Sequence, residues 1–275
     1  MTELNIEKDM VDWEFYDESW PVKMKPGFEL YLRKGCEYSR KRFVYKVTEA
    51  KELDFLEKFD FSELVCIDIG SNIGYWSVYL GAKLKARQVH GFEPDPITFS
   101  ILEKNVVHNK IEAKIIINPC AISEVEKTIN LYLISENSGN NRPNFVEGRE
   151  SIQVKSVSID QYIKTYQINK VDFIKIDIEG GETAALDGSA KTISRDKPVL
   201  MLEFVPRVVA DRCYGLKERL LNLMEMHNMS LYFVDNHILL PIKLDQLDQY
   251  SGNLFVSTDN SWLCNPTANL SRSSL

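Results

Sequence analysis

The sequence predicts an α/β protein built on a mostly parallel sheet with helices on both faces. From Leu64 onward, short apolar runs alternate with segments of helical periodicity, which is typical of such sheets. Val65, Ile67 and Ile69 are β-branched and suit a strand that is covered on both sides. The chain has 275 residues, of which 44% are hydrophobic, enough for one large domain with a full core and some appendages.

Local sequence patterns predict the individual helices and strands. Pro96 suits the first turn of a helix over 96–108, and residues 73–84 are apolar at helical spacing. Residues 127–134 and 151–157 alternate as an antiparallel pair, and we interpret the polar segment 135–144 between them as a surface excursion rather than a flap. Parallel strands are predicted near 64–69, 88–93, 113–119, 171–177 and 199–204.

The ends of the chain are less regular. Residues 1–48 are charged and rich in aromatic side chains, and we expect them to form an N-terminal cap laid against the main sheet, with a strand within 27–35. A domain over 49–258 follows, with helices over 48–60 and 208–226 and final strands at 230–234 and 253–257. The tail, 259–275, is polar, although Trp262 is a candidate to dock on the domain.

Composition excludes several functional classes. The net charge is −7 and no basic run occurs, so we expect no nucleic-acid partner. No apolar stretch approaches the roughly 18 residues that span a bilayer, and the first residues lack a signal-peptide core. Five dispersed cysteines suit reduced thiols and a cytoplasmic location. The four histidines form no metal-ligand pair, so we predict no zinc site and assign no metal ligand, although magnesium at the oxygens of Asp177 and Glu179 stays open.

The most informative segment is V-C-I-D-I-G-S-N-I-G, residues 65–74. It has the form of a buried strand followed by a glycine loop that opens a helix. A dinucleotide fold needs glycine where Asn72 stands, because a side chain there occupies the position of the pyrophosphate. Asp68 suits a cationic ligand, and Glu93, about twenty residues on, suits both hydroxyls of a ribose. A ribose, no pyrophosphate and a cationic amino-acid end describe S-adenosylmethionine.

Three alternatives to this interpretation stay open. Asp68 and Glu93 are also typical capping acids of an ordinary α/β domain. A nicotinamide-dependent oxidoreductase on a Rossmann sheet is the main competing enzyme, although Asn72 and Asp68 argue against it. A non-catalytic protein that binds the same ligand is the third.

A second chemical signal lies in the strand I-K-I-D-I-E, residues 174–179. Alternation places Lys175, Asp177 and Glu179 on one face and three isoleucines on the other. A lysine in a strand buried on both sides needs a charged partner. The acids are therefore either an internal ion pair that fixes the strand end or groups that face a methyl donor and an acceptor hydroxyl.

Six segments along the chain form a recognisable series: I-D-I-G-S-N-I-G-Y-W-S (67–77), G-F-E-P-D-P (91–96), N-P-C-A-I-S (118–123), V-K-S-V-S-I-D (154–160), I-K-I-D-I-E-G-G-E (174–182) and P-V-L-M-L-E-F (198–204). With these motifs in order, the chain resembles the FkbM-type family of class I S-adenosylmethionine-dependent methyltransferases, over roughly residues 45–245. The resemblance implies a Rossmann-like, seven-stranded sheet with an antiparallel edge formed by the final strands. It also implies O-methylation of a sugar, glycan or secondary-metabolite hydroxyl. Ser71 and Gly181 stand where the family more often has alanine.

The resemblance also assigns roles. Residues 70–74, with Gly70, Ser71, Asn72 and Gly74, would wrap the methionine end of the cofactor, and Asn72 would bind its carboxylate. Glu93 would hold the ribose, while Pro94, Cys120 and Ala121 would contact the adenine.

Transfer of a methyl group to a hydroxyl is helped by a carboxylate base. Glu179 is the first candidate for this base, Asp177 for positioning, and Glu203, at the end of the next strand, is the reserve. Lys175 would keep these carboxylates ionised or orient them.

Overall fold

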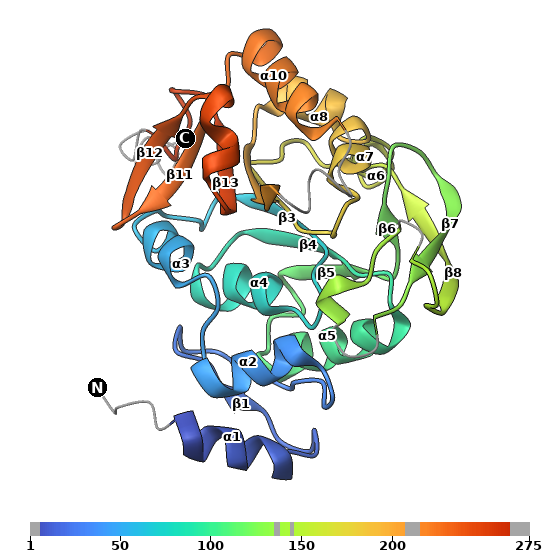
Figure 1. The fold of residues 1–275 in the computed structure, drawn as a ribbon. Helices are drawn as coiled ribbons and strands as arrows, with labels where there is room; N and C mark the ends of the chain where they lie inside the picture. The colour runs from blue at the N-terminus through green and yellow to red at the C-terminus, as the bar shows by residue number, and fades with distance from the viewer. Residues whose placement is uncertain (1–5, 135–137, 144–145, 207–214, 265–275) are drawn as a thin grey trace.

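A computed structural model describes residues 6–134, 138–143, 146–206 and 215–264 (Figure 1). Its helices are α1 (Ile6–Phe15), α2 (Glu37–Tyr45), α3 (Ala50–Leu56), α4 (Tyr75–Val78), the π-helix η1 (Tyr79–Lys83), α5 (Pro96–His108), the 3₁₀ helix η2 (Ser138–Asn140), α6 (Ile159–Thr165), α7 (Glu182–Asp187), α8 (Ala190–Asp196), α10 (Leu216–His227) and the 3₁₀ helix η3 (Leu244–Gln249). Its strands are β1 (Val22–Lys23), β2 (Glu29–Leu30), β3 (Val65–Ile69), β4 (Gln88–Phe92), β5 (Ile115–Asn118), β6 (Ala121–Ile122), β7 (Lys127–Tyr132), β8 (Ser151–Val157), β9 (Phe173–Ile176), β10 (Val199–Phe204), β11 (Ser230–Asp235), β12 (Ile238–Ile242) and β13 (Gly252–Ser257).

The main sheet has the order β12-β11-β13-β10-β9-β3-β4-β5. The five predicted parallel strands are confirmed, and β13, β11 and β12 form the expected antiparallel edge. The described sheet has eight strands rather than seven because β12 folds back on β11. That hairpin turns at Asn236 and His237, both with positive φ, and lacks the glycine that normally marks such a turn.

Two apolar cores lie on the two faces of this sheet, as alternation requires. Cys66 and Phe173 belong to the core beneath α3, α4 and α5. Ile67 and Ile174, the next residues along the same strands, belong to the core beneath α6, α8 and α10. Lys175 lies on the same face of β9 as Phe173, and its register partner on β3 is Asp68. These two charged residues therefore lie at the carboxyl end of the sheet, next to the first core.

The helix after the glycine loop differs from the single helix predicted over 73–84. It begins as four α-helical residues and continues as the π-helix η1. Gly81 lies in that wider turn, where a Cβ would come 2.9 Å from the side chain of Ile115 on β5. The predicted helix over 208–226 is confirmed from Leu216 onward, and its first part lies outside the described residues.

The N-terminal cap packs on helices rather than on the sheet, which corrects the expected arrangement (Figure 1). The Asn105 side chain on α5 accepts a hydrogen bond from the Tyr31 amide at 2.6 Å and donates to the Tyr31 carbonyl at 3.0 Å. Phe28 packs edge-on against Tyr75 of α4, with ring centroids 5.4 Å apart. The strand expected within 27–35 is only β2, because these bonds to α5 replace strand pairing after Leu30.

A smaller sheet, β6-β8-β7, lies beside the main sheet and contains the predicted antiparallel pair (Figure 1). At the other end of the domain, Trp262 docks as expected. Its Nε1 donates to the Asp172 carbonyl at 3.2 Å, and its ring lies 5.1 Å from that of Phe61. None of the helices in the described ranges combines the length and the apolar character that a bilayer crossing requires.

Candidate active site

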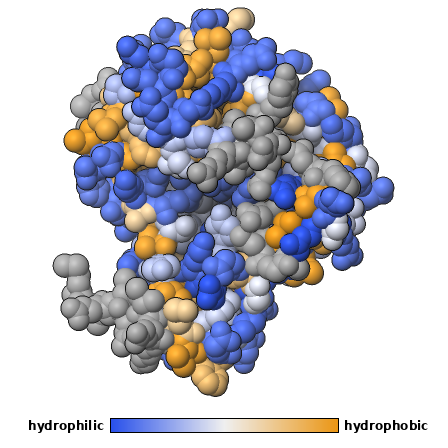
Figure 2. Space-filling view, in the orientation of Figure 1, coloured by the Kyte–Doolittle hydropathy of each residue, from blue (hydrophilic) through white to orange (hydrophobic). Residues whose placement is uncertain are grey.

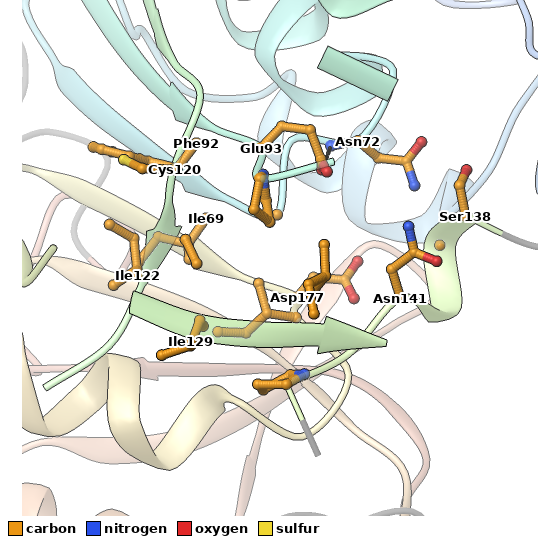
Figure 3. Close-up of a pocket in the computed structure, with 17 residues that line it drawn as sticks. Ile69, Asn72, Phe92, Glu93, Cys120, Ile122, Ile129, Ser138, Asn141 and Asp177 are labelled. Atoms are coloured by element: carbon orange, nitrogen blue, oxygen red, sulfur yellow. Dashed lines mark hydrogen bonds between the residues drawn. The ribbon is translucent and has the colours of Figure 1, made fainter. Parts of the chain in front are cut away.

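Two cavities meet beyond the carboxyl ends of β3, β4 and β9, where open α/β sheets bind ligands. The first has a volume of about 580 Å³, including space open to solvent, and is largely apolar. Figure 3 shows Ile69, Phe92, Cys120, Ile122 and Ile129 on one side of it and Asn72, Ser138 and Asn141 on the other. The second has a volume of about 660 Å³, also open to solvent, and is lined mostly by polar and aromatic side chains, Tyr38, Arg42, Glu49, Trp76, Lys175 and Glu203 among them. Residues of both linings are Gly70, Asn72, Gly139 and Asp177.

The glycine loop separates these cavities. Gly70 has a φ of 85°, and a Cβ there would lie 2.0 Å from the backbone oxygen of Asp177. Only glycine fits between the ends of β3 and β9 at this point. Asn72 follows with a φ of 50°, a conformation that asparagine tolerates, and its Oδ1 accepts from the Ile73 amide at 2.7 Å. The loop is therefore rigid and exposes Asn72 to both cavities.

Glu93 lies at the end of β4 and faces the first cavity beside Asn72 (Figure 3). Its two carboxyl oxygens accept from the amides of Asn72 and Asp95, each at 2.9 Å. Burial raises the pKa of Glu93 to about 8, although these bonds oppose the shift. Pro94, Cys120 and Ala121 line the same cavity, so the structure brings together the residues expected to contact a ribose and an adenine.

Asp68 lies under the loop, and Ser71, a loop residue that lines the second cavity, makes its hydroxyl contacts with the strand ends below. Asp68 is fully buried, lines neither cavity and accepts from the Ser77 hydroxyl at 2.6 Å. Ser71 Oγ donates to the Asp68 carbonyl and accepts from the Phe92 amide, both at 3.0 Å. The Ser71 hydroxyl thus links the ends of β3 and β4, which the alanine more common in the family could not do. Asp68 therefore cannot contact a ligand in either cavity directly, and the expected contact with a cationic ligand is not supported.

Gly74 caps α4 with a φ of 94°, and a Cβ there would lie 2.6 Å from Leu102. It lines neither cavity, so its contribution is the close approach of the loop to α5.

Lys175 projects from β9 into the second cavity and is buried. Its Nζ lies 2.8 Å from Asp177 Oδ2 and 5.6 Å from the centre of the Trp76 ring. Burial disfavours the ammonium, but the charges of Asp177, Glu49 and Asp68 outweigh it and raise the pKa of Lys175. The predicted ion pair exists, and Asp177 faces both cavities as well, so the two interpretations of this strand are compatible.

Three carboxylates surround the junction of the cavities. One oxygen each of Asp177, Glu179 and Glu203 lies within 4.8 Å of the others. Asp177, burial and Glu179 together raise the pKa of Glu203 to about 9. Glu203 lines the second cavity, whereas Glu179 is buried, has a φ of 53° and lines neither. Carboxylates at this spacing also suit a divalent cation, the alternative that the sequence left open at Asp177 and Glu179.

Several lining residues were not predicted. Ser138, Gly139, Asn141 and Pro143 line the first cavity, so the surface-excursion interpretation is wrong for 138–143. Residues 135–137 and 144 lie outside the described part of the chain. Strand alternation in β7 places Ile129 and Leu131 on one face and could have flagged them. No sequence signal indicated Tyr38 and Arg42, because their place depends on how the N-terminal cap packs.

Comparison with known proteins identifies the family. Residues 68–228 match the methyltransferase FkbM domain. "Methyltransferase sdnD" of Sordaria araneosa is 23% identical over 152 residues, covering 44% of this chain and 59% of that protein. "31-O-demethyl-FK506 methyltransferase FkbM" of Streptomyces tacrolimicus is 32% identical over 60 residues, 22% of each chain. The chain thus spans 59% and 22% of the lengths of these two curated relatives, less than two thirds in each case.

Solved structures with a similar arrangement include methyltransferase FkbM from Methylobacillus flagellatus KT. It is 18% identical, with 80% of this chain and 55% of that chain covered and a TM-score of 0.48. An O-methyltransferase from Bacillus cereus, solved in complex with SAH, is 14% identical, with 77% and 82% covered and a TM-score of 0.47. Because the FkbM domain spans more than half of the sequence, the chain belongs to the FkbM methyltransferase family.

Proposed function

We propose that the protein is an S-adenosylmethionine-dependent O-methyltransferase. The observation that carries the proposal is the junction of the two cavities. A largely apolar cavity with Glu93 in its wall adjoins, at Asn72 and Asp177, a cavity that holds carboxylates and a lysine. The first has the chemistry of a nucleoside site, and the second has the chemistry that activates a hydroxyl.

The residues of the first cavity fit the cofactor. Glu93 is held by two backbone amides, so its carboxyl group is oriented before a ribose diol arrives. Pro94, Cys120 and Ala121 would contact the adenine, and burial raises the pKa of Cys120 to about 11, which keeps that thiol neutral and apolar. When bound, S-adenosylmethionine supplies a methyl group on a positively charged sulfur.

The second cavity would hold the acceptor hydroxyl. Asp177 is oriented by its ion pair with Lys175 and would accept a hydrogen bond from that hydroxyl. Glu203 becomes the preferred base in place of Glu179, because it lines the cavity and Glu179 does not. Since the pKa of Glu203 is about 9, its basic form increases between neutral pH and pH 9. We therefore expect turnover to rise with pH across this range.

Ligand binding tests the proposal first. Calorimetry of the full chain should show one S-adenosylhomocysteine bound per protein and no heat with NAD. Binding of NAD without S-adenosylhomocysteine would support the oxidoreductase instead.

Turnover tests the assignment of the base. With tritiated S-adenosylmethionine and a panel of sugar and polyketide alcohols, Glu203→Gln should lose at least 100-fold in rate, and exposed Glu63→Gln should match wild type. Glu179→Gln and Asp177→Asn complete the series. If all three acid variants stay within tenfold of wild type, no carboxylate of this cluster is the base. An unchanged rate in EDTA would separate base catalysis from catalysis by a divalent cation at the same cluster.

A further inference from the structure

A buried arginine of the N-terminal cap points to a ligand group that the proposed function leaves unassigned. Arg42 is the sixth residue of α2 and is 8% exposed. It lines the second cavity, yet its Nε and Nη1 atoms have no hydrogen-bond partner in the described structure. A guanidinium carries its charge at every accessible pH, so this is a permanent positive charge with unused donors at the active site.

Aromatic rings hold the guanidinium in place. Its central carbon lies 5.3 Å from the centre of the Tyr38 ring and 5.2 Å from that of Tyr75. The Tyr75 hydroxyl accepts from the Thr48 amide at 3.1 Å, which fixes that ring. The faces of the two rings attract the cation but offer it no hydrogen-bond acceptor. A buried ion needs a charged or hydrogen-bonding partner to offset its loss of water, so the rings alone leave Arg42 poorly compensated.

The acids that line the same cavity are already engaged. Asp177 is paired with Lys175. Glu49 accepts from the Trp76 indole and, at 2.9 Å, from the Asn253 amide. Glu203 has a pKa of about 9 and is therefore mostly neutral at pH 7. Among the described residues, none of these acids forms an ion pair with the Arg42 guanidinium. The Arg42 donors are therefore available to a ligand.

We propose that Arg42 binds a carboxylate of the bound ligands in the second cavity. A guanidinium forms strong charge-assisted hydrogen bonds with a carboxylate, and Arg42 lines the cavity with donors that no described residue uses. The carboxylate belongs either to the amino-acid end of the cofactor or to an acidic acceptor such as a uronic acid. The inference rests on the proposed function. It gives the N-terminal cap, which precedes the matched residues 68–228, a part in ligand binding.

Calorimetry with two nucleosides distinguishes the sources. S-adenosylhomocysteine carries the carboxylate, and 5′-methylthioadenosine lacks the whole amino-acid end. If the cofactor is the source, Arg42→Met weakens S-adenosylhomocysteine at least tenfold and leaves 5′-methylthioadenosine unchanged. Arg42→Lys keeps the charge without the planar fork and recovers only part of the loss. Arg40→Met is the matched control, because Arg40 lies on the same helix, pairs with Glu37 at the surface and should bind both nucleosides as wild type does.

If the acceptor is the source, both nucleosides bind Arg42→Met normally. The protein saturated with S-adenosylhomocysteine then binds D-glucuronate, not D-glucose, and Arg42→Met abolishes this binding. Equal S-adenosylhomocysteine affinities, together with no Arg42-dependent binding of D-glucuronate, overturn the inference. Unchanged binding of 5′-methylthioadenosine shows that the variant is folded. Failure of wild type to bind either nucleoside is a different result, which overturns the proposed function and the inference with it.

Discussion

Replacement of Glu203 by glutamine should remove a pH-dependent loss of stability. Asp177 and burial raise the pKa of Glu203 to about 9, against an ordinary value of 4.5. Between these two values the folded state keeps a proton that the unfolded state has released. The free energy of unfolding therefore falls as pH rises through this window, by about 1.4 kcal/mol per pH unit. From pH 5 to pH 8 this amounts to as much as about 4 kcal/mol.

Glutamine has the shape of the protonated carboxyl group but does not titrate. The stability of Glu203→Gln relative to wild type should therefore increase with pH from 5 to 8 and level off above about pH 9. Urea denaturation of both proteins at each pH measures this difference. The subtraction cancels other groups with raised pKa values, such as Glu93 and Glu52.

The size of the trend decides whether the carboxylate cluster exists as described. A rise of at least 1 kcal/mol between pH 5 and pH 8 is expected even if solvent screens part of the interaction. A difference that stays constant over this range would refute the reasoning. It would mean that Glu203 titrates normally and is not held against Asp177 and Glu179.

Three further substitutions test the packing around the site by denaturation. Gly70→Ala should lose about 2–5 kcal/mol, because its Cβ meets the Asp177 carbonyl at positive φ; wild-type stability would contradict the loop geometry. Lys175→Met should lose about 1–3 kcal/mol, because Asp177, whose side chain is 29% exposed, keeps its charge without the buried Lys175 ammonium; a neutral effect would mean that the ion pair does not stabilise the fold. Trp262→Ala should lose about 3–5 kcal/mol; a loss under 1 kcal/mol would show that the residue does not dock.

The sequence predicted the centre of the fold better than its edges. Val65–Ile69 and Phe173–Ile176 are short and rich in β-branched residues, and they are followed by Gly70 and Gly180, so the pattern predicts buried parallel strands. The hairpin at Asn236 and His237 was missed because its turn conformation comes without glycine. The strand expected within 27–35 was overestimated because side-chain bonds from Asn105 take the place of strand pairing.

In the candidate site, too, residues that follow a strand were predicted, and residues placed by tertiary packing were not. Glu93, Pro94 and Cys120 follow their strands directly, so strand order alone brings them to one cavity. Two acids near the carboxyl ends of neighbouring strands differ in their access to the cavity. Asp68, the last but one residue of β3, is fully buried beneath the loop, whereas Glu93, directly after β4, lies in the cavity wall. Arg42 reaches the site only through the packing of the cap, which no local pattern records.

The central claim is that Glu93 holds the sugar of a nucleoside cofactor. Calorimetry with S-adenosylhomocysteine on wild type, Glu93→Ala and the exposed control Glu103→Ala tests it most directly. We expect wild type and Glu103→Ala to bind one equivalent with equal affinity and Glu93→Ala to bind at least tenfold more weakly. Equal affinity in all three proteins, or no binding to wild type, would contradict the claim.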